Sequence, residues 1–398
     1  MPRRPSFLLL IVLGLVRTLS AQQPVTRADA IAAALDRGAR AALGRADTAA
    51  AAAILHTARL YPNPSVAASY TKDTPHYHII ADLPIDFPWL RGARIGAAAA
   101  AHEAARYGFA YERAAIRFDV DTTYTHAVAA RAHAALSHRT ALDADSLLRM
   151  ALIRLQVGDV SELDVRLAEV NSGTLQNAAA DDSLAALDGL LAVQLAMGLP
   201  GAEPTIVLTD SISAPDDTAI TTPGEALLVT AAAADLRAQE RTVTLAHRSL
   251  LPAPSLQVGF ERGDPSGPFG VLPTFGLAFA VPFFHRNGGE VRLAIAARER
   301  ARATLDLTER QTQSAFAAAQ RTYAAAQARL ARDHRLLAGA DTVAAMSLHA
   351  YAEGAVALPN VLEAQRNARD ALARYIDDLA AAHDAAAMLR LLTATDTP

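Results

Sequence analysis

The stretch GDVSELDV at residues 158–165 returns 196 positions later as GAVALPNV at residues 354–361. Two landmarks upstream of it return in the same order: PNPS at 62–65 as PAPS at 252–255, and FPWL at 87–90 as VPFF at 281–284. Three landmarks in one order and at nearly one offset indicate a duplicated structural unit. The period is far longer than that of a solenoid repeat, so each half is expected to be a large unit of helix, hairpin, helix and helix.

The first 21 residues have the pattern of a secretory signal. Arg3 and Arg4 are basic, residues 7–16 form a short apolar run, and Ala21 is a small residue at the expected cleavage point. That run is shorter than the ~20 residues of a membrane-spanning helix, and no later run reaches that length. Loss of Arg3, Arg4 and Arg17 moves the formal charge from −4 to −7, which argues against nucleic acid as a partner. With no cysteine, the chain forms no disulfide.

Two long stretches without proline, each rich in Ala, Leu, Arg, Glu and Gln, predict two very long helices at 90–157 and 288–353. At ~1.5 Å per residue the first is about 100 Å long. Shorter helices are predicted after them, at 160–198 and 357–393, and before the hairpins, at about 25–60 and 223–250. The expected division is a signal at 1–21, a first repeat at 22–198, a linker at 199–223, a second repeat at 224–393 and a tail at 394–398.

Two short segments ahead of the long helices alternate with period 2, which is typical of half-buried strands. They predict β-hairpins at about 64–86 and 254–282, with strands of about the ~9–11 residues that cross a membrane. Leu277 and Phe279 lie on the predicted apolar face, and Ser69, Gln257 and Ala278 on the polar or small face. On the helices alone, a soluble coiled-coil stalk would be an equal alternative. The hairpins favour a membrane protein.

Two hairpins supply four strands, and a four-stranded sheet has open edges that lipid does not tolerate. The chain is therefore expected to share a barrel with copies of itself. Two copies would give eight strands, whose interior is filled by side chains, whereas three give twelve strands and a pore. A dimeric barrel stays open as an alternative. The predicted fold is mainly α with a small β part: a trimeric α-helical barrel, coaxial with a shared 12-stranded transmembrane β-barrel.

At these residues the chain resembles the TolC family of outer-membrane efflux proteins. The turns at 157–165 and 351–364 look like the two helix–helix turns of that family, and 62–64 like its strand-opening motif. Residues 282–290, PFFHRNGGE, most resemble the branch that serves heavy-metal pumps of the cobalt–zinc–cadmium type. The resemblance implies a homotrimer in outer-membrane lipid, with a helical tunnel across the periplasm. It also implies a periplasmic adaptor and an inner-membrane RND-type pump, no enzymatic activity, no cofactor and no metal site.

The resemblance also implies a gate at the periplasmic end. Tyr351 matches the family's gate tyrosine and Asp164 its aspartate partner, so a hydrogen bond between them is expected. Asn360 and Glu363 fall where acidic constriction residues occur, while Val356 stands where the family has an arginine. The expected adaptor-docking residues are at the two tips: Gly158, Val160, Gly354 and Val356.

One other class of protein fits part of the pattern. A periplasmic coiled-coil adaptor or scaffold without membrane insertion would share the long helices. Such a protein would carry other β domains and would lack the duplicated alternating hairpins. The sequence does not identify the cargo, which is either metal cations or drugs and other small molecules.

Overall fold

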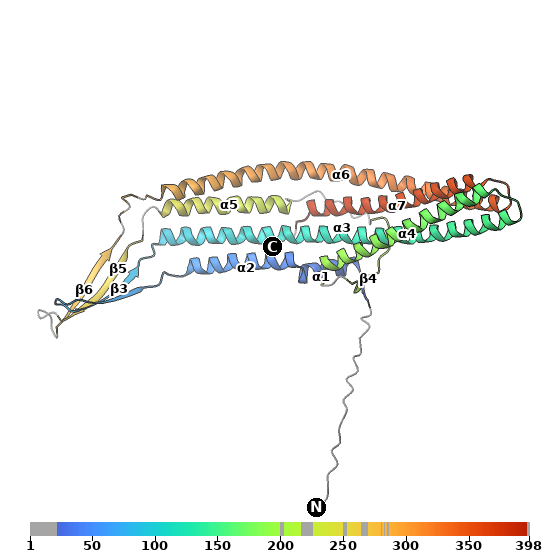
Figure 1. Ribbon diagram of the computed structural model, residues 1–398. Helices are drawn as coiled ribbons and strands as arrows, with labels where there is room; N and C mark the ends of the chain where they lie inside the picture. The colour runs from blue at the N-terminus through green and yellow to red at the C-terminus, as the bar shows by residue number, and fades with distance from the viewer. Residues whose placement is uncertain are drawn as a thin grey trace, which may run out of the picture.

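The computed structural model describes residues 22–199, 203–215, 226–249, 253–263, 270–279, 281, 283–284 and 286–395. The expected signal at 1–21 lies outside them. The molecule is elongated, with a β-sheet at one end, two helix turns at the other, and helices running side by side between them (Figure 1). In the described residues no helix combines the length and the apolar character needed to cross a membrane.

Four helices build the turn-bearing part of the body. They are α3 (Pro88–Gln156), α4 (Glu162–Ala196), α6 (Gly288–Ala352) and α7 (Leu358–Leu392). The ends of all four helices lie within two residues of their expected bounds. α3 begins with Pro88 in its first turn, where the missing N–H has no intrahelical partner to lose. Alanine is the commonest buried residue of α3, α6 and α7, which lets the antiparallel helices approach closely.

The expected opening helix at 25–60 is wrong as a single element. The structure has α1 (Arg27–Arg37) and α2 (Ala39–Arg59), separated by Gly38 in an extended conformation. A Cβ on Gly38 would lie 2.2 Å from the carbonyl oxygen of Ala34, so only glycine fits this break. In the second half, α5 (Leu227–Arg248) is one helix within the expected 223–250; residues 223–225 and 250 lie outside the described part.

The sheet contains β2 (Ser65–Tyr70), β3 (Tyr77–Pro84), β5 (Ser255–Arg262) and β6 (Val271–Ala278). The two hairpins pair through β3 and β5, giving the order β2-β3-β5-β6 with every neighbour antiparallel. The expected length of 9–11 residues is wrong for these strands: β2 has 6 residues and the others have 8. Pro64 directly precedes β2 and Pro84 ends β3, and proline cannot donate to a ladder.

A second, smaller sheet was not predicted. β1 (Gln23–Val25) pairs in parallel with β4 (Ile206–Leu208), a strand inside the region expected to be a linker without structure. Val25, Ile206 and Leu208 are buried in one cluster with Tyr124 of α3 and Val193 of α4. The Tyr124 hydroxyl donates to the Val25 carbonyl at 3.0 Å. The β1–β4 sheet and its packing on α3 and α4 thus attach the N-terminal strand and the linker to the middle of the helical body.

Candidate functional site: the tip of the helical body

The two helix turns have the same backbone construction. Gly158 and Gly354 both lie in the left-handed region, with φ of 79° and 75°. The Gly158 N–H donates to the Leu155 carbonyl at 3.0 Å, and the Gly354 N–H donates to the Tyr351 carbonyl at 2.9 Å. Glycine tolerates this conformation without the steric cost that a Cβ brings, so it ends both helices. The duplication inferred from the sequence therefore extends to the geometry of the turns.

The helices that leave the two turns begin differently. At α4, the Ser161 hydroxyl accepts from the Asp164 N–H at 3.2 Å, and Asp164 Oδ2 accepts from the Ser161 N–H at 3.1 Å. This reciprocal pair is a capping box, which satisfies two N–H groups that lack helical partners. At α7, Ala357 offers no side-chain cap, and Pro359 follows in the first turn. The first turn is capped by its own residues, and the second is not.

The expected hydrogen bond between Tyr351 and Asp164 is wrong in this structure. Asp164 Oδ2 accepts instead from Ser161, through both the backbone N–H and the hydroxyl, the latter at 2.8 Å. The Asp164 charge still lies near enough to raise the pKa of Tyr351, although burial of the phenol is the larger cause of that rise and Arg154 opposes it. The Ser-x-x-Asp pattern at 161–164 is a capping signature, so the sequence did carry the signal for the role Asp164 has here.

Tyr351 is the largest side chain of a small core that joins both turns. It is 1% exposed and packs with residues from the other three helices: Leu147 and Ala151 of α3, Val165 and Ala168 of α4, and Leu358 and Val361 of α7. Its hydroxyl oxygen is buried and has no hydrogen-bond partner among the described residues. A phenol that donates to nothing in an apolar core is destabilising.

Arg154, near the end of α3, is the polar residue that connects the turns. Its Nε donates to Asp159 Oδ2 at 2.8 Å, and its Nη2 lies 2.7 Å from the same oxygen. Its Nη1 donates to the Tyr351 carbonyl at 2.8 Å, and the guanidinium lies 4.8 Å from the centre of the Tyr351 ring. The Asp159 carboxylate raises the pKa of Arg154, so the charge persists. Sequence reasoning missed Arg154 because its partner lies 197 residues away.

The remaining expected gate and docking residues lie at or near this core. Val356 is half-buried and packs against the tip core, as an apolar residue in the position expected for an arginine. Asn360 and Glu363 are exposed on the first turns of α7. Gly158 and Gly354 are exposed on the turns, and Val160 is half-buried beside them. The structure thus gathers the expected residues at one end, with no carboxylate bonded to the tyrosine hydroxyl.

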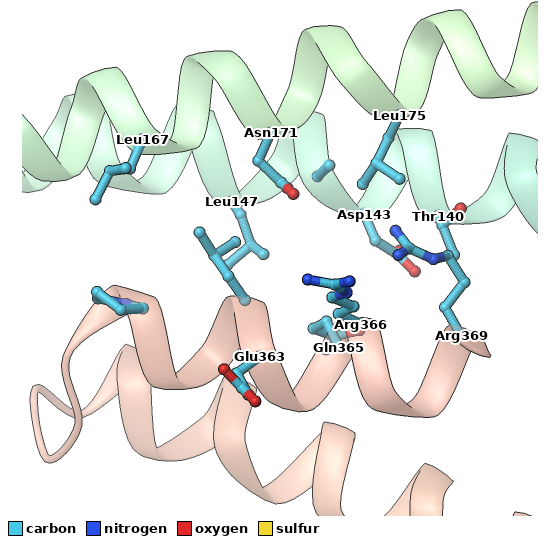
Figure 2. Close-up of a pocket in the computed structure, with 13 residues that line it drawn as sticks. Thr140, Asp143, Leu147, Leu167, Asn171, Leu175, Glu363, Gln365, Arg366 and Arg369 are labelled. Atoms are coloured by element: carbon cyan, nitrogen blue, oxygen red, sulfur yellow. The ribbon is translucent and has the colours of Figure 1, made fainter. Parts of the chain in front are cut away.

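A groove of about 320 Å³ opens next to the tip, between α4 on one side and α7 on the other, with α3 behind them (Figure 2). Its walls combine apolar residues with an about equal number of polar and charged ones, and Asn171 and Arg366 point into it while Glu363 points away (Figure 2). The lining residues are Thr140, Asp143, Ala144, Leu147, Leu167, Asn171, Leu175, Pro359, Leu362, Glu363, Gln365, Arg366 and Arg369. A groove between two helices with both apolar and charged walls has the character of a surface that an amphipathic helix could contact.

The described residues contain no group of three His, Asp or Glu side chains placed to hold a metal ion. The arrangement at the tip consists of a helix cap, ion pairs on the turns and adjoining helix ends, one arginine–tyrosine stack and an apolar core. These groups hold helices against one another.

No protein-family model matches the chain, and no curated protein matches it in sequence. Several solved structures do match in fold. The outer-membrane protein VceC of Vibrio cholerae is 17% identical, with a TM-score of 0.75, covering 92% of this chain and 96% of its own. The outer-membrane channel CmeC of Campylobacter jejuni is 16% identical, with a TM-score of 0.81, covering 92% and 85%. CusC, whose structures show conformational changes that accompany folding and transmembrane channel formation, is 15% identical, with a TM-score of 0.76, covering 92% and 90%. The fold expected for the single chain from the family resemblance is confirmed.

Proposed function

We propose that the chain is the outer-membrane channel of a tripartite efflux system, a passive exit duct that catalyses no reaction. The observation that carries the proposal is the sheet at one end of the long helical body. Among the described residues the outer edges of β2 and β6 have no partner strand, and one face of the sheet is apolar and exposed. In this proposal the sheet lies in the outer membrane and the helical body extends into the periplasm, where it receives substrates. The fold it shares with outer-membrane channels supports this placement.

The order of the strands supports assembly from several copies. In an all-antiparallel sheet of four strands, β2 and β6 run in opposite directions, so β6 of one copy can pair antiparallel with β2 of the next. Closure in this manner removes every edge, as a sheet in lipid requires. Three copies give twelve strands and a pore, whereas two give a barrel filled by its own side chains. We therefore propose a homotrimer.

The two faces of the sheet differ as a lipid face and a water-filled interior should. Across one row of neighbours lie Val66, Ala81, Val258 and Phe275, of which Val66 is 70% and Phe275 75% exposed. Across the adjacent row, on the opposite face, lie Ser65, Asp82, Gln257 and Gly276. Gln257 Nε2 donates to Asp82 Oδ1 at 2.7 Å, which orders the polar row. A soluble scaffold would leave the apolar face without a function.

The tip supports the proposed partners. A periplasmic adaptor built from helical hairpins would dock at Gly158, Val160, Gly354 and Val356, with an amphipathic helix in the groove beside them (Figure 2). The adaptor in turn connects to an inner-membrane RND-type pump, which selects the cargo. The likeness of residues 282–290 to the heavy-metal branch makes metal cations the first substrate class to test, with drugs as the alternative. Pro282 and His285 of that segment lie outside the described residues.

The decisive experiment is to determine the mass of the detergent-solubilised protein and then its conductance in planar bilayers. We expect a trimer that forms ion channels and that fractionates with outer membranes in cells. A monodisperse monomer in mild detergent with native helix content would contradict the proposal. Fractionation with the soluble periplasm would instead support the adaptor or scaffold class.

A further inference from the structure

The apolar face of the sheet ends, at the hairpin turns, in a row that contains two tyrosines and an arginine. Across the four strands this row holds Tyr70, Tyr77, Arg262 and Val271. Arg262 lies four residues after Val258 on β5, so both point to the apolar face. Tyr70 is 65% and Tyr77 54% exposed, and their ring centres lie 5.3 Å apart. The row is at the end of the sheet that is remote from the helical body (Figure 1).

An open pocket of about 620 Å³ lies at this row, on the two central strands of the sheet. The described residues that line it are Tyr77, Ile79, Phe260, Arg262, Gly263 and Gly270. The Gly263 N–H donates to the Gly270 carbonyl at 2.7 Å, and neither glycine has a side chain that would fill the space. The volume is in the range of pockets that hold a small ligand. Because β3 and β5 are the central strands, pairing of β2 with β6 of another copy leaves the pocket open.

Arg262 is the charged residue of the pocket. It is exposed, and none of the carboxylates in the described part of the chain forms an ion pair with it. The adjacent Glu261 points to the opposite face, where its Oε1 lies 3.3 Å from His78 Nδ1. The turn between β2 and β3 adds Lys72 and Asp73, one charge of each sign. An arginine without a carboxylate partner, beside aromatic and aliphatic side chains, suits a ligand that has both an anionic group and an apolar part.

The position of the pocket decides what kind of ligand this is. In the proposed duct the helical body extends into the periplasm, so the hairpin turns at the other end of the sheet lie at the outer surface of the membrane. Membrane barrels carry aromatic girdles at both interfaces, and long cationic side chains there reach the headgroups. A lipid beside the pocket presents acyl chain to Ile79 and Phe260 and headgroup to Arg262. A soluble anion would leave the apolar part of the pocket without a contact.

We propose that this pocket binds one phosphorylated lipid of the outer leaflet, with Arg262 on the phosphate and Tyr77, Ile79 and Phe260 along the adjoining acyl chain. The inference rests on the proposed function, because an outer-membrane channel places this end of the sheet in the outer leaflet. A guanidinium donates two parallel hydrogen bonds to a phosphate, which gives the contact its specificity. Each site is built within one protomer, so a trimer carries three of them.

The test measures, by native mass spectrometry, how tightly the detergent-solubilised full chain binds diphosphoryl lipid A, a phosphorylated glycolipid. We expect one bound molecule per protomer and much weaker binding of the same lipid without its phosphates. Arg262→Gln should weaken lipid A binding about 10-fold or more, because hydrogen bonds from a charged donor are lost. Arg262→Lys should weaken it less, because it keeps the charge but loses the fork. Ile79→Trp, which fills the pocket and leaves the charge in place, should also weaken it.

The matched control is Lys72→Gln, which removes an exposed cation from the neighbouring turn, outside the pocket lining. It should leave lipid A binding unchanged. Equal losses in Lys72→Gln and Arg262→Gln would overturn the site, because the lipid would then respond to surface charge alone. Equally tight binding of phosphatidylglycerol, or displacement of lipid A by millimolar inorganic phosphate, would overturn it as well. If Arg262→Gln alters the circular dichroism or the melting temperature, Ile79→Trp decides, since it keeps Arg262.

Lipid binding and channel formation can fail separately. A monomer that prefers the phosphorylated lipid would contradict the duct and leave the lipid site standing, because the whole pocket belongs to one protomer. A conducting trimer that binds the lipid equally well with and without its phosphates would refute the site and leave the duct standing.

Discussion

The two halves of the duplication follow the same order of elements, yet their long helices are held by different contacts. α3 packs against α1, α2, α4, α5 and α7, whereas α6 packs chiefly against α5 and α7. α3 buries the polar residues Asp121, Thr125 and Ser137. The buried residues recorded for α6 are alanines, Leu330 and two tyrosines. Duplication has preserved the pattern of helices, while the side chains buried along the two long helices differ.

The middle of the body shows this difference most clearly. Asp121 of α3 pairs with Arg27 of α1 and, at 2.7 Å, with Arg390 of α7. It thereby joins both halves through one carboxylate with a side chain that is 10% exposed. In the second half, α6 and α7 meet in an apolar cluster that includes Tyr323, Ala385 and Leu389. Arg329 of α6 also pairs with Asp378 of α7 at 2.8 Å. Asp121 thus joins three helices through one carboxylate, whereas the ion pair of the second half joins α6 and α7 only.

Removal of Asp121 should have the largest effect. Asp121→Ala leaves two arginines facing each other without their shared carboxylate, and breaking a buried ion pair costs about 3–5 kcal/mol. The measurement is chemical unfolding followed by the helical circular dichroism signal. The control is Asp119→Ala, two residues away, where the exposed pair with Arg40 is worth about 1 kcal/mol or less. Equal losses in the two variants would show that the charge cluster does not position α3.

The sheet is the region where the two halves should behave alike. Phe275→Arg in the second hairpin and Val66→Arg in the first place a charge in the same row of the apolar face. Each should cost about 2–4 kcal/mol near the bilayer midplane. Thr274→Arg, on the opposite face, should be much milder. Trimer yield after detergent extraction reports the effect, and a defect as severe at 274 as at 275 would show that the assignment of faces is wrong.

An exchange of helix caps tests the difference between the turns. Ser161→Ala should destabilise the start of α4 by about 1 kcal/mol, since it removes the capping box. Ala357→Ser should stabilise the start of α7 by up to about 1 kcal/mol, since it supplies an acceptor that the second turn lacks. Hydrogen exchange at 162–164 and 358–361 measures both. If Ala357→Ser has no effect there, the second turn is already satisfied by other contacts.

The smallest effect concerns pH at the join between the linker and α7. Burial lowers the pKa of His383, whose Nε2 lies 2.7 Å from the Ser213 carbonyl oxygen. Because the folded pKa is below the unfolded value, this group costs no stability above the unfolded pKa, and stability falls as pH decreases through that range. The pKa of the adjacent Asp384 is raised, chiefly by burial, which acts in the opposite sense. We expect a slight loss of stability from pH 7.5 to 5.5 that His383→Gln reduces; an unchanged loss in that variant would exclude His383 as its source.

The sequence predicted the long helices and the hairpins because their signals are local. Stretches without proline and period-2 alternation depend only on neighbouring residues, and both turn glycines mark helix ends. The break at Gly38 was missed because an isolated glycine in an alanine-rich helix is ordinarily tolerated. β1 and β4 were missed because strands of three residues exist only through their pairing. The contacts of Arg154 and Asp121 join segments far apart in the chain, so no local pattern announces them.

The parallel pairing of Gln23–Val25 with Ile206–Leu208 has a consequence for biogenesis. Synthesis from the N-terminus produces β1 first, but the partner strand β4 follows only after the whole α3–α4 hairpin. Closing so long a loop is slow compared with forming a local hairpin. β1 therefore has no partner strand until β4 has been made. The pairing of β1 with β4 then completes the first half. In the order of synthesis, the β1–β4 pairing thus follows the other elements of the first half and precedes the second half.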